Sequence, residues 1–303
     1  FHWARTEDGE PWIGTSCQMP GAHSWWPCKA SFFHPEDKPE RVRVDLTVPD
    51  GLYAVSNGRL TGTEDAGEGW TTYRWLHDYP LQTYTVTLNV APYRVVEDRI
   101  AGLPGHEAPL PFLYYVLPES AEKAAVQFRE VPELMRVYCE AFGPYPFPES
   151  KLGFVETSFW GMEHSTAIAY GSSWPAWCAE NGERDPIASR NRWFDYILVH
   201  ELAHEWWGNA VSAADWGHFW IHEGFSTYAE GVYVERTRGR EAADKFFHEQ
   251  GRNVGKRSTL YRGRGVDSRQ AYSRSIYAKG AAVLHTLRHY VDDDEAWWAA
   301  LKD

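Results

Sequence analysis

The chain has 303 residues, of which 43% are hydrophobic and 16% are aromatic, and its formal net charge is -12. This apolar content can form one large core or two smaller ones, so the chain is expected to fold. The acidic balance leaves no basic stripe to neutralise phosphates, which argues against a nucleic-acid partner, and no run of about 18 apolar residues predicts a membrane span.

Residues 1–112 are expected to form an antiparallel all-β domain. Two segments, 41–48 ("RVRVDLTV") and 83–90 ("TYTVTLNV"), alternate polar with apolar or β-branched residues at a period of two, which is typical of strands. The turn sequences "PDG" and "SNG" return the chain between such strands. No long helical pattern interrupts this part.

The character of the sequence changes at the Pro/Gly-rich segment 103–111, which we take as the boundary of a second domain over residues 113–303. This domain is expected to begin with a strand at 113–118 and a helix that starts after Ser120 and ends at Gly143. The remaining segments are expected in chain order: short strands at 151–157 and 166–171, a polar loop at 177–191, and helices at 193–207, 219–237 and 275–291.

The helix at 193–207 carries the sequence "VHELAHEWWGN". Residues four apart lie on one face of a helix, so His200 and His204 can offer two imidazoles to one ion. Glu201 lies about 100° further around the axis, beside that ion, where a glutamate can act as base to a metal-bound water. The alternative for this motif taken alone is a buried histidine pair that is hydrogen-bonded to backbone.

A second glutamate favours the metal. Glu223 follows His204 after eighteen intervening residues, in an aromatic-rich helix, where a lone buried carboxylate would be costly. Two histidines and one glutamate with an open fourth position are typical of a catalytic zinc site. Glu230, seven residues further on, either accepts an N–H from a ligating imidazole or is an exposed surface residue.

These residues resemble the aminopeptidase N-type zinc aminopeptidases, a gluzincin family. The spacing of His200, His204 and Glu223 is similar to the family's zinc motif, segment 160–171 ("WGMEHSTAIAYG") resembles its Gly-x-Met-Glu-Asn motif, and 277–284 ("YAKGAAVL") resembles its Tyr-x-Lys-Gly segment. Segments 15–28 and 48–58 resemble the β domain that precedes the catalytic domain in the family. The match covers nearly the whole chain, with four motifs in the family's order.

The resemblance implies a thermolysin-like catalytic domain with one zinc ion, which hydrolyses the N-terminal residue from peptides. A zinc-bound water attacks with Glu201 as general base, and Tyr277 donates its phenol to the oxyanion. Glu163 binds the free α-amine of the substrate. Gly161, Met162 and Gln18 are also expected at the substrate.

Three positions depart from the family pattern. Trp160 stands at the motif's first glycine, His164 at its terminal asparagine, and His222 where many relatives have asparagine before the third ligand. These departures leave the zinc ligands intact and affect the shape of the amine pocket. His164 is expected to be a packing residue.

Other functions remain possible on the same residues. A thermolysin-type endopeptidase uses the same ligands, and a family-related epoxide hydrolase would need a lipid pocket to which no sequence feature points. The resemblance also implies missing chain at both ends, so a zinc-stabilised fragment that binds peptides without turnover is a further alternative.

The chain opens without a signal peptide, which leaves the compartment open and favours a soluble cytoplasmic protein. Its four cysteines are expected to be free thiols, with Cys17 and Cys28 the only pair close enough in sequence to bridge.

Overall fold

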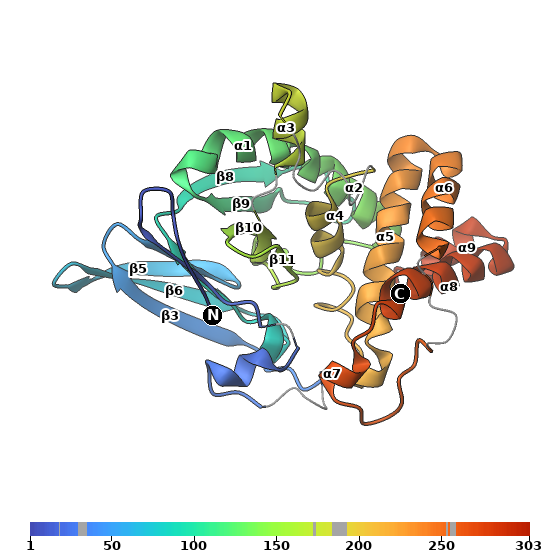
Figure 1. Ribbon diagram of the computed structural model, residues 1–303, viewed down its shortest axis with the longest axis horizontal. Helices are drawn as coiled ribbons and strands as arrows, with labels where there is room; N and C mark the ends of the chain where they lie inside the picture. Colours follow the sequence, from blue (N-terminus) through green and yellow to red (C-terminus); the bar gives the residue numbers. More distant parts are fainter. Residues whose placement is uncertain (18, 30–34, 172–173, 184–192, 253, 255–258) are drawn as a thin grey trace.

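The computed structural model describes residues 1–17, 19–29, 35–171, 174–183, 193–252, 254 and 259–303. Figure 1 shows an N-terminal region of sheets on one side, a central sheet covered by helices, and a helical C-terminal region on the other side. None of the described helices is long and apolar enough to cross a bilayer. All four cysteines are free, as expected.

The N-terminal region contains two antiparallel sheets, which confirms the expected all-β architecture. The first has four strands in the order β1 (His2–Arg5), β2 (Pro11–Gly14), β7 (Leu88–Ala91) and β4 (Tyr53–Ser56). The second has three strands in the order β3 (Val42–Pro49), β6 (Trp70–His77) and β5 (Arg59–Gly67). A short 3-10 helix, η1 (Met19–Ser24), lies between β2 and β3.

The expected strand at 83–90 is wrong in its first half. Residues Thr83–Thr85 form a 3-10 turn, η2, and only the later part enters β7. All three side chains of this turn are buried, whereas a strand would turn alternate residues to opposite faces. The turn therefore directs the Tyr84 side chain inward.

The central sheet is mixed and has five strands in the order β11 (Gly161–Met162), β12 (Ile168–Gly171), β10 (Leu152–Thr157), β9 (Leu110–Val116) and β8 (Arg94–Ile100). Strands β9, β10 and β12 run parallel, and the two edge strands are antiparallel to their neighbours. Strand β8 precedes residue 112 in sequence yet pairs with β9, so this sheet extends to both sides of the expected domain boundary. The boundary itself stays a prediction.

The segment between β9 and β10 is not one helix. It consists of η3 (Pro118–Ser120), α1 (Ala121–Gln127), the 3-10 turn η4 (Phe128–Glu130) and α2 (Val131–Phe142). Pro132 has no N–H to donate and is tolerated only in a first helical turn, so a new helix begins there. Ser120 precedes α1, but its hydroxyl donates to Glu156 Oε1 at 2.8 Å rather than capping the helix.

Two further expectations are corrected. The segment 177–191 was expected to be a loop, but Pro175–Asn181 forms α3, and residues 184–192 lie outside the described part of the chain. Helix α4 (Tyr196–Ala203) ends four residues before the expected end at Trp207. The backbone then turns, and the Trp207 carbonyl accepts a hydrogen bond from His204 Nδ1.

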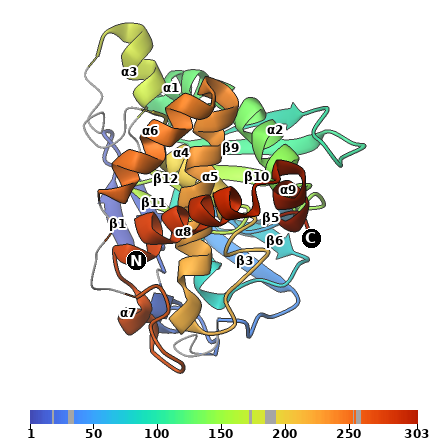
Figure 2. The same ribbon diagram turned by 90° about the vertical axis from the view of Figure 1, so that its right-hand side faces the viewer.

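The helical region follows α4 in the chain. It contains η5 (Trp216–His218), α5 (Trp220–Arg238), α6 (Arg240–Gly251), α7 (Ser268–Ala271), α8 (Ser275–Val291) and α9 (Asp294–Ala300). Figure 2 shows α8 crossing α5, and the two backbones approach closely at Gly224 and Gly280. A Cβ atom on Gly280 would lie 2.6 Å from the Cα atom of Gly224, so the crossing requires glycine. This contact fixes how α8 lies over the N-terminal half of α5.

Candidate zinc-dependent active site

The site begins with helix α4, whose first turn is fixed from outside. The Asp195 carboxylate caps the helix by accepting the Leu198 N–H at 3.3 Å, and it also accepts the Tyr170 hydroxyl at 2.6 Å. This cap satisfies an otherwise unpaired N–H and ties α4 to strand β12. His200 and His204 therefore project from a helix that is anchored at its start.

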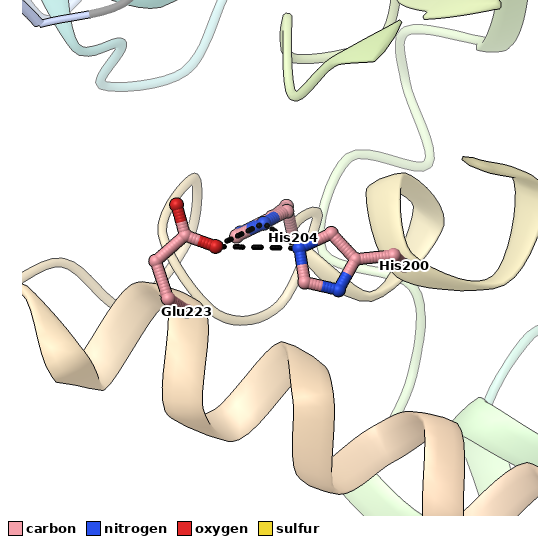
Figure 3. A group of neighbouring side chains, drawn as sticks. All are labelled: His200, His204 and Glu223. Atoms are coloured by element: carbon pink, nitrogen blue, oxygen red, sulfur yellow. Dashed lines mark hydrogen bonds and ion pairs between the residues drawn. The ribbon is translucent and has the colours of Figure 1, made fainter. Parts of the chain in front are cut away.

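Three side chains from α4 and α5 converge on one point (Figure 3). His200 Nε2 lies 3.2 Å from His204 Nε2 and 3.3 Å from Glu223 Oε2, and His204 Nε2 lies 3.5 Å from the same oxygen. A tetrahedral zinc with bonds of about 2.0–2.1 Å would separate its ligand atoms by about 3.3–3.4 Å. The triangle formed by these three atoms therefore has the size that a zinc ion requires.

The outer nitrogens of both imidazoles are engaged, which leaves the inner nitrogens for an ion. His200 Nδ1 donates to Glu230 Oε1 at 2.8 Å, and His204 Nδ1 donates to the Trp207 carbonyl at 2.9 Å. Because neither acceptor can donate, each Nδ1 carries a proton, and an ion at the centre would displace any proton from the two Nε2 atoms and bind their lone pairs. Glu230 is only 1% exposed, so the exposed-surface alternative for this residue is wrong.

The charges of the cluster also favour a cation. Burial alone would raise the pKa of Glu223, but hydrogen bonds from His200 and His204 outweigh burial and hold it well below its usual range. Burial alone would lower the pKa of His200, but Glu223 and Glu230 raise it well above its usual range. Positive charge between the buried carboxylates therefore stabilises them, and a divalent ion can supply this charge.

Glu201 and Glu163 line the same cavity of about 450 Å³ as the three converging residues. Burial raises the pKa of Glu201 to about 7, although the neighbouring His200 and His204 oppose the shift. A Cβ atom on Gly161, in strand β11, would lie 2.9 Å from Glu201 Oε1. Any larger residue at this position would therefore displace the Glu201 carboxylate. Met162 follows in β11 and is buried.

Tyr277 reaches the cavity from α8. Its ring lies over that of His200 with centroids 5.9 Å apart, and its hydroxyl lies 2.6 Å from the hydroxyl of Tyr272. Burial raises the pKa of Tyr277, and Glu223 and Tyr272 raise it further, so the phenol keeps its proton and can donate it in a hydrogen bond.

The sequence indicated three further residues at the site. Gln18 lies outside the described residues. Trp160 lines the cavity and is 42% exposed, with its ring 5.7 Å from that of Tyr196. His164 is fully buried, and neither ring nitrogen has a hydrogen-bond partner among the described residues, which agrees with packing as its main contribution.

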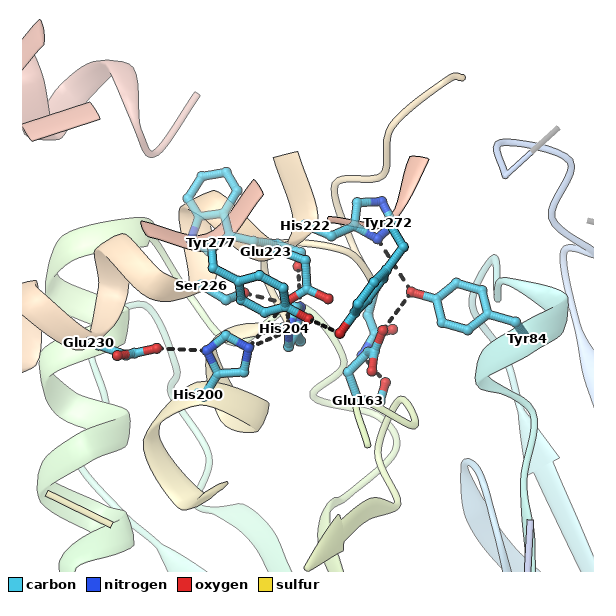
Figure 4. A network of polar contacts seen from close by, with 12 residues as sticks. Tyr84, Glu163, His200, His204, His222, Glu223, Ser226, Glu230, Tyr272 and Tyr277 are labelled. Carbon is cyan, nitrogen blue, oxygen red and sulfur yellow. Dashed lines mark hydrogen bonds and ion pairs between the residues drawn. The ribbon is translucent and has the colours of Figure 1, made fainter. Parts of the chain in front are cut away.

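The sequence did not indicate Tyr84, which lies more than a hundred residues from the zinc motif and enters the site from the N-terminal region (Figure 4). Its hydroxyl donates to Glu163 Oε1 at 3.0 Å and lies 3.3 Å from His222 Nδ1. His222 was noted only as a departure from the family pattern. A tyrosine in a segment that reads as a strand carries no signal for such a contact.

A second group of possible metal ligands lies on the surface between α6 and α8. It consists of Asp244, His285 and His289, with ligand atoms within 4.8 Å of one another. His289 Nδ1 already donates to the His285 carbonyl, and Asp244 is 55% exposed. Among the described residues, the buried group is therefore the one whose geometry and charge fit a resident ion.

The chain is similar in sequence to known peptidases. Residues 127–302 match the peptidase family M1 domain, and the chain belongs to this family. Mouse endoplasmic reticulum aminopeptidase 1 is 24% identical over 308 residues, which cover 96% of this chain and 31% of that protein. Mouse aminopeptidase B is 26% identical over 270 residues, which cover 85% of this chain and 38% of that protein.

The fold is also similar to solved structures of the family. The M1 zinc metallopeptidase from Deinococcus radiodurans superposes with a TM-score of 0.76 and 25% identity. The match covers 96% of this chain and 61% of that chain. The present chain therefore spans less than two thirds of the length of these relatives.

Proposed function

We propose that this chain is a zinc-dependent aminopeptidase that removes the N-terminal residue from peptides. The observation that carries the proposal is one cavity that holds both the converging group of His200, His204 and Glu223 and the separate buried carboxylate of Glu163. The first group supplies a place for the ion, and the second supplies an anion where a peptide's α-amine can bind. Relatives named as aminopeptidases support this reading.

Each residue then has a part in the reaction. Zinc bound by His200, His204 and Glu223 would polarise the scissile carbonyl and lower the pKa of a coordinated water. Glu201 accepts a proton from the attacking water and passes it to the leaving nitrogen, for which its raised pKa is suited. Tyr277 donates its hydroxyl to the carbonyl oxygen as negative charge develops there.

Glu163 gives the site its direction along the peptide. The residue is 4% exposed and lies in the cavity wall next to strand β11. A substrate with a free α-amine gains an ion pair with this buried charge, whereas an internal peptide segment leaves the charge unpaired. This difference favours the aminopeptidase over an endopeptidase with the same zinc ligands.

The test is hydrolysis of a panel of free aminoacyl fluorogenic amides and their N-acetylated forms by the zinc-loaded chain. We expect turnover of the free amides that stops when a chelator removes zinc. Glu163→Ala should reduce kcat/KM for the free amides far more than for any acetylated substrate. Equal cleavage of both forms by the unsubstituted chain would indicate an endopeptidase. Zinc binding without turnover would indicate the peptide-binding alternative.

A further inference from the structure

We infer that Tyr84 and His222 are positioning residues that orient the Glu163 carboxylate for the substrate's α-amine. The inference rests on the proposed aminopeptidase function and adds two residues to it. It would make the N-terminal β region, through Tyr84, a contributor to recognition of the peptide's N-terminus.

The hydrogen bonds among these residues run in one direction. The Ala213 N–H donates to His222 Nε2 at 3.0 Å, so that nitrogen is unprotonated and the ring proton lies on Nδ1. His222 Nδ1 faces the Tyr84 hydroxyl at 3.3 Å, so the hydroxyl oxygen accepts this proton. The Tyr84 hydroxyl then donates its own proton to Glu163 Oε1 at 3.0 Å. A backbone N–H therefore sets the direction of the two hydrogen bonds that lead to Glu163.

The network is rigid because it is buried. Tyr84 and His222 are both fully buried, and both rings pack against Trp216, with centroids 5.8 Å and 6.2 Å away (Figure 4 shows the two residues and Glu163). The backbone of Glu163 is fixed separately, because Asn209 Nδ2 donates to its carbonyl at 3.1 Å. Because the Tyr84 and His222 rings cannot move, rotation of the Glu163 carboxylate would break its hydrogen bond to Tyr84. Glu163 is therefore held in one orientation before substrate binds.

This arrangement has a consequence for binding. A glutamate side chain in a cavity without such a partner loses rotamer freedom when an amine docks, and that loss weakens the complex. With Oε1 held by Tyr84, the other oxygen stays available to the ligand at a fixed position. The contact should therefore act on ligands with a free amine and leave N-blocked ligands unaffected.

The experiment measures binding without turnover. The parent is the zinc-loaded Glu201→Gln chain, titrated by calorimetry with Ala-Ala-Ala and with its N-acetylated form. Adding Tyr84→Phe should weaken binding of the free peptide about ten- to a hundredfold, as for loss of a hydrogen bond to a charged group. Binding of the acetylated peptide should stay within about twofold, because it makes no ion pair with Glu163.

A matched control removes a buried hydroxyl elsewhere. Tyr93 is buried in the N-terminal region and donates to the Glu156 carbonyl at 2.8 Å, outside the cavity. Tyr93→Phe should change neither affinity. His222→Asn tests the same network from its other end and should act in the same direction as Tyr84→Phe. Combining Tyr84→Phe with His222→Asn should add little, because both act through one carboxylate oxygen.

The outcomes separate this inference from the function on which it rests. A parent that prefers the free peptide, with that preference intact in Tyr84→Phe and in His222→Asn, would overturn the positioning inference alone. Equal weakening of both peptides would also overturn it, since a general structural defect has that result. A parent without preference for the free peptide would contradict the aminopeptidase function itself.

Discussion

Gly280→Ala should reduce both stability and activity, because the crossing of α5 and α8 has no room for a methyl group. The new Cβ atom would lie 2.6 Å from the Cα atom of Gly224, and the partner is backbone, which cannot rotate away. Carbon atoms pack at about 3.5–4.0 Å, so α8 must move outward by about 1 Å. Overpacking of this kind reduces the free energy of unfolding by about 1–3 kcal/mol.

The shift also reaches the reaction centre. Tyr277 lies one turn before Gly280 on α8, and its ring packs over His200 on α4. A displacement of about 1 Å at a positioned catalytic group lowers the rate by about 100-fold. Gly280→Ala should therefore lower the melting temperature by about 2–6 °C and lower kcat/KM sharply, while zinc content stays unchanged.

The assay combines thermal unfolding, zinc analysis and hydrolysis of a free aminoacyl amide. The control is Gly251→Ala at the end of α6, where a Cβ atom would meet nothing within 4 Å. This control should be neutral or slightly stabilising. If Gly280→Ala matched Gly251→Ala in melting temperature, the packing argument would be refuted. If it melted lower with unchanged activity, the link from this crossing to Tyr277 would be refuted.

Three further changes test other parts of the site. Glu201→Gln should retain zinc and lose hydrolysis by about 10²–10⁴-fold, and substantial residual turnover would remove Glu201 from its proposed part. Glu230→Gln should weaken zinc binding about 10–100-fold in competition with a chelator, because His200 Nδ1 loses its carboxylate acceptor; unchanged affinity would contradict this. Asn57→Ala should lower the free energy of unfolding by about 2–4 kcal/mol, measured by urea denaturation. The substitution leaves three buried backbone groups without their hydrogen-bond partner: the Ser165 carbonyl, 2.6 Å from Asn57 Nδ2, the Thr85 carbonyl and the Thr87 N–H. An unchanged denaturation midpoint would refute the claim that these buried groups need Asn57.

The sequence alone predicts the parts of this protein that depend on short-range spacing. Two imidazoles four residues apart must share a helix face, so His200 and His204 could be assigned before any fold was known. Alternation over 41–48 predicted a strand, and β3 lies there. The helix at 275–291 was predicted at its observed bounds, because its apolar period is unbroken by proline. Glu230 was left open between two readings, and its 1% exposure excludes one of them.

The remaining errors are at Thr83–Thr85 and at the end of helix α4. Residues Thr83–Thr85 alternate like a strand, yet Tyr84 gains more by burying its ring against Trp216 and donating to Glu163. Helix α4 ends at Ala203, and the Trp207 carbonyl beyond it accepts from His204 Nδ1, a local contact that the apolar pattern of this segment did not indicate. Trp216 and Glu163 lie far outside the sequence window around Tyr84 that sets local propensity, so local patterns could not indicate these two contacts.

The sequence by itself predicted the proposed zinc ligands, the proposed general base and the family, because these predictions rest on residue identity and on spacing along the chain. Only the tertiary structure decided which atoms face the centre and which residues contact Glu163. It brings His222 from α5 and Glu163 from the segment after β11 within hydrogen-bond distance of the Tyr84 hydroxyl, which comes from the N-terminal region. Such contacts depend on how sheets and helices pack in three dimensions, and no local pattern in the chain encodes that packing.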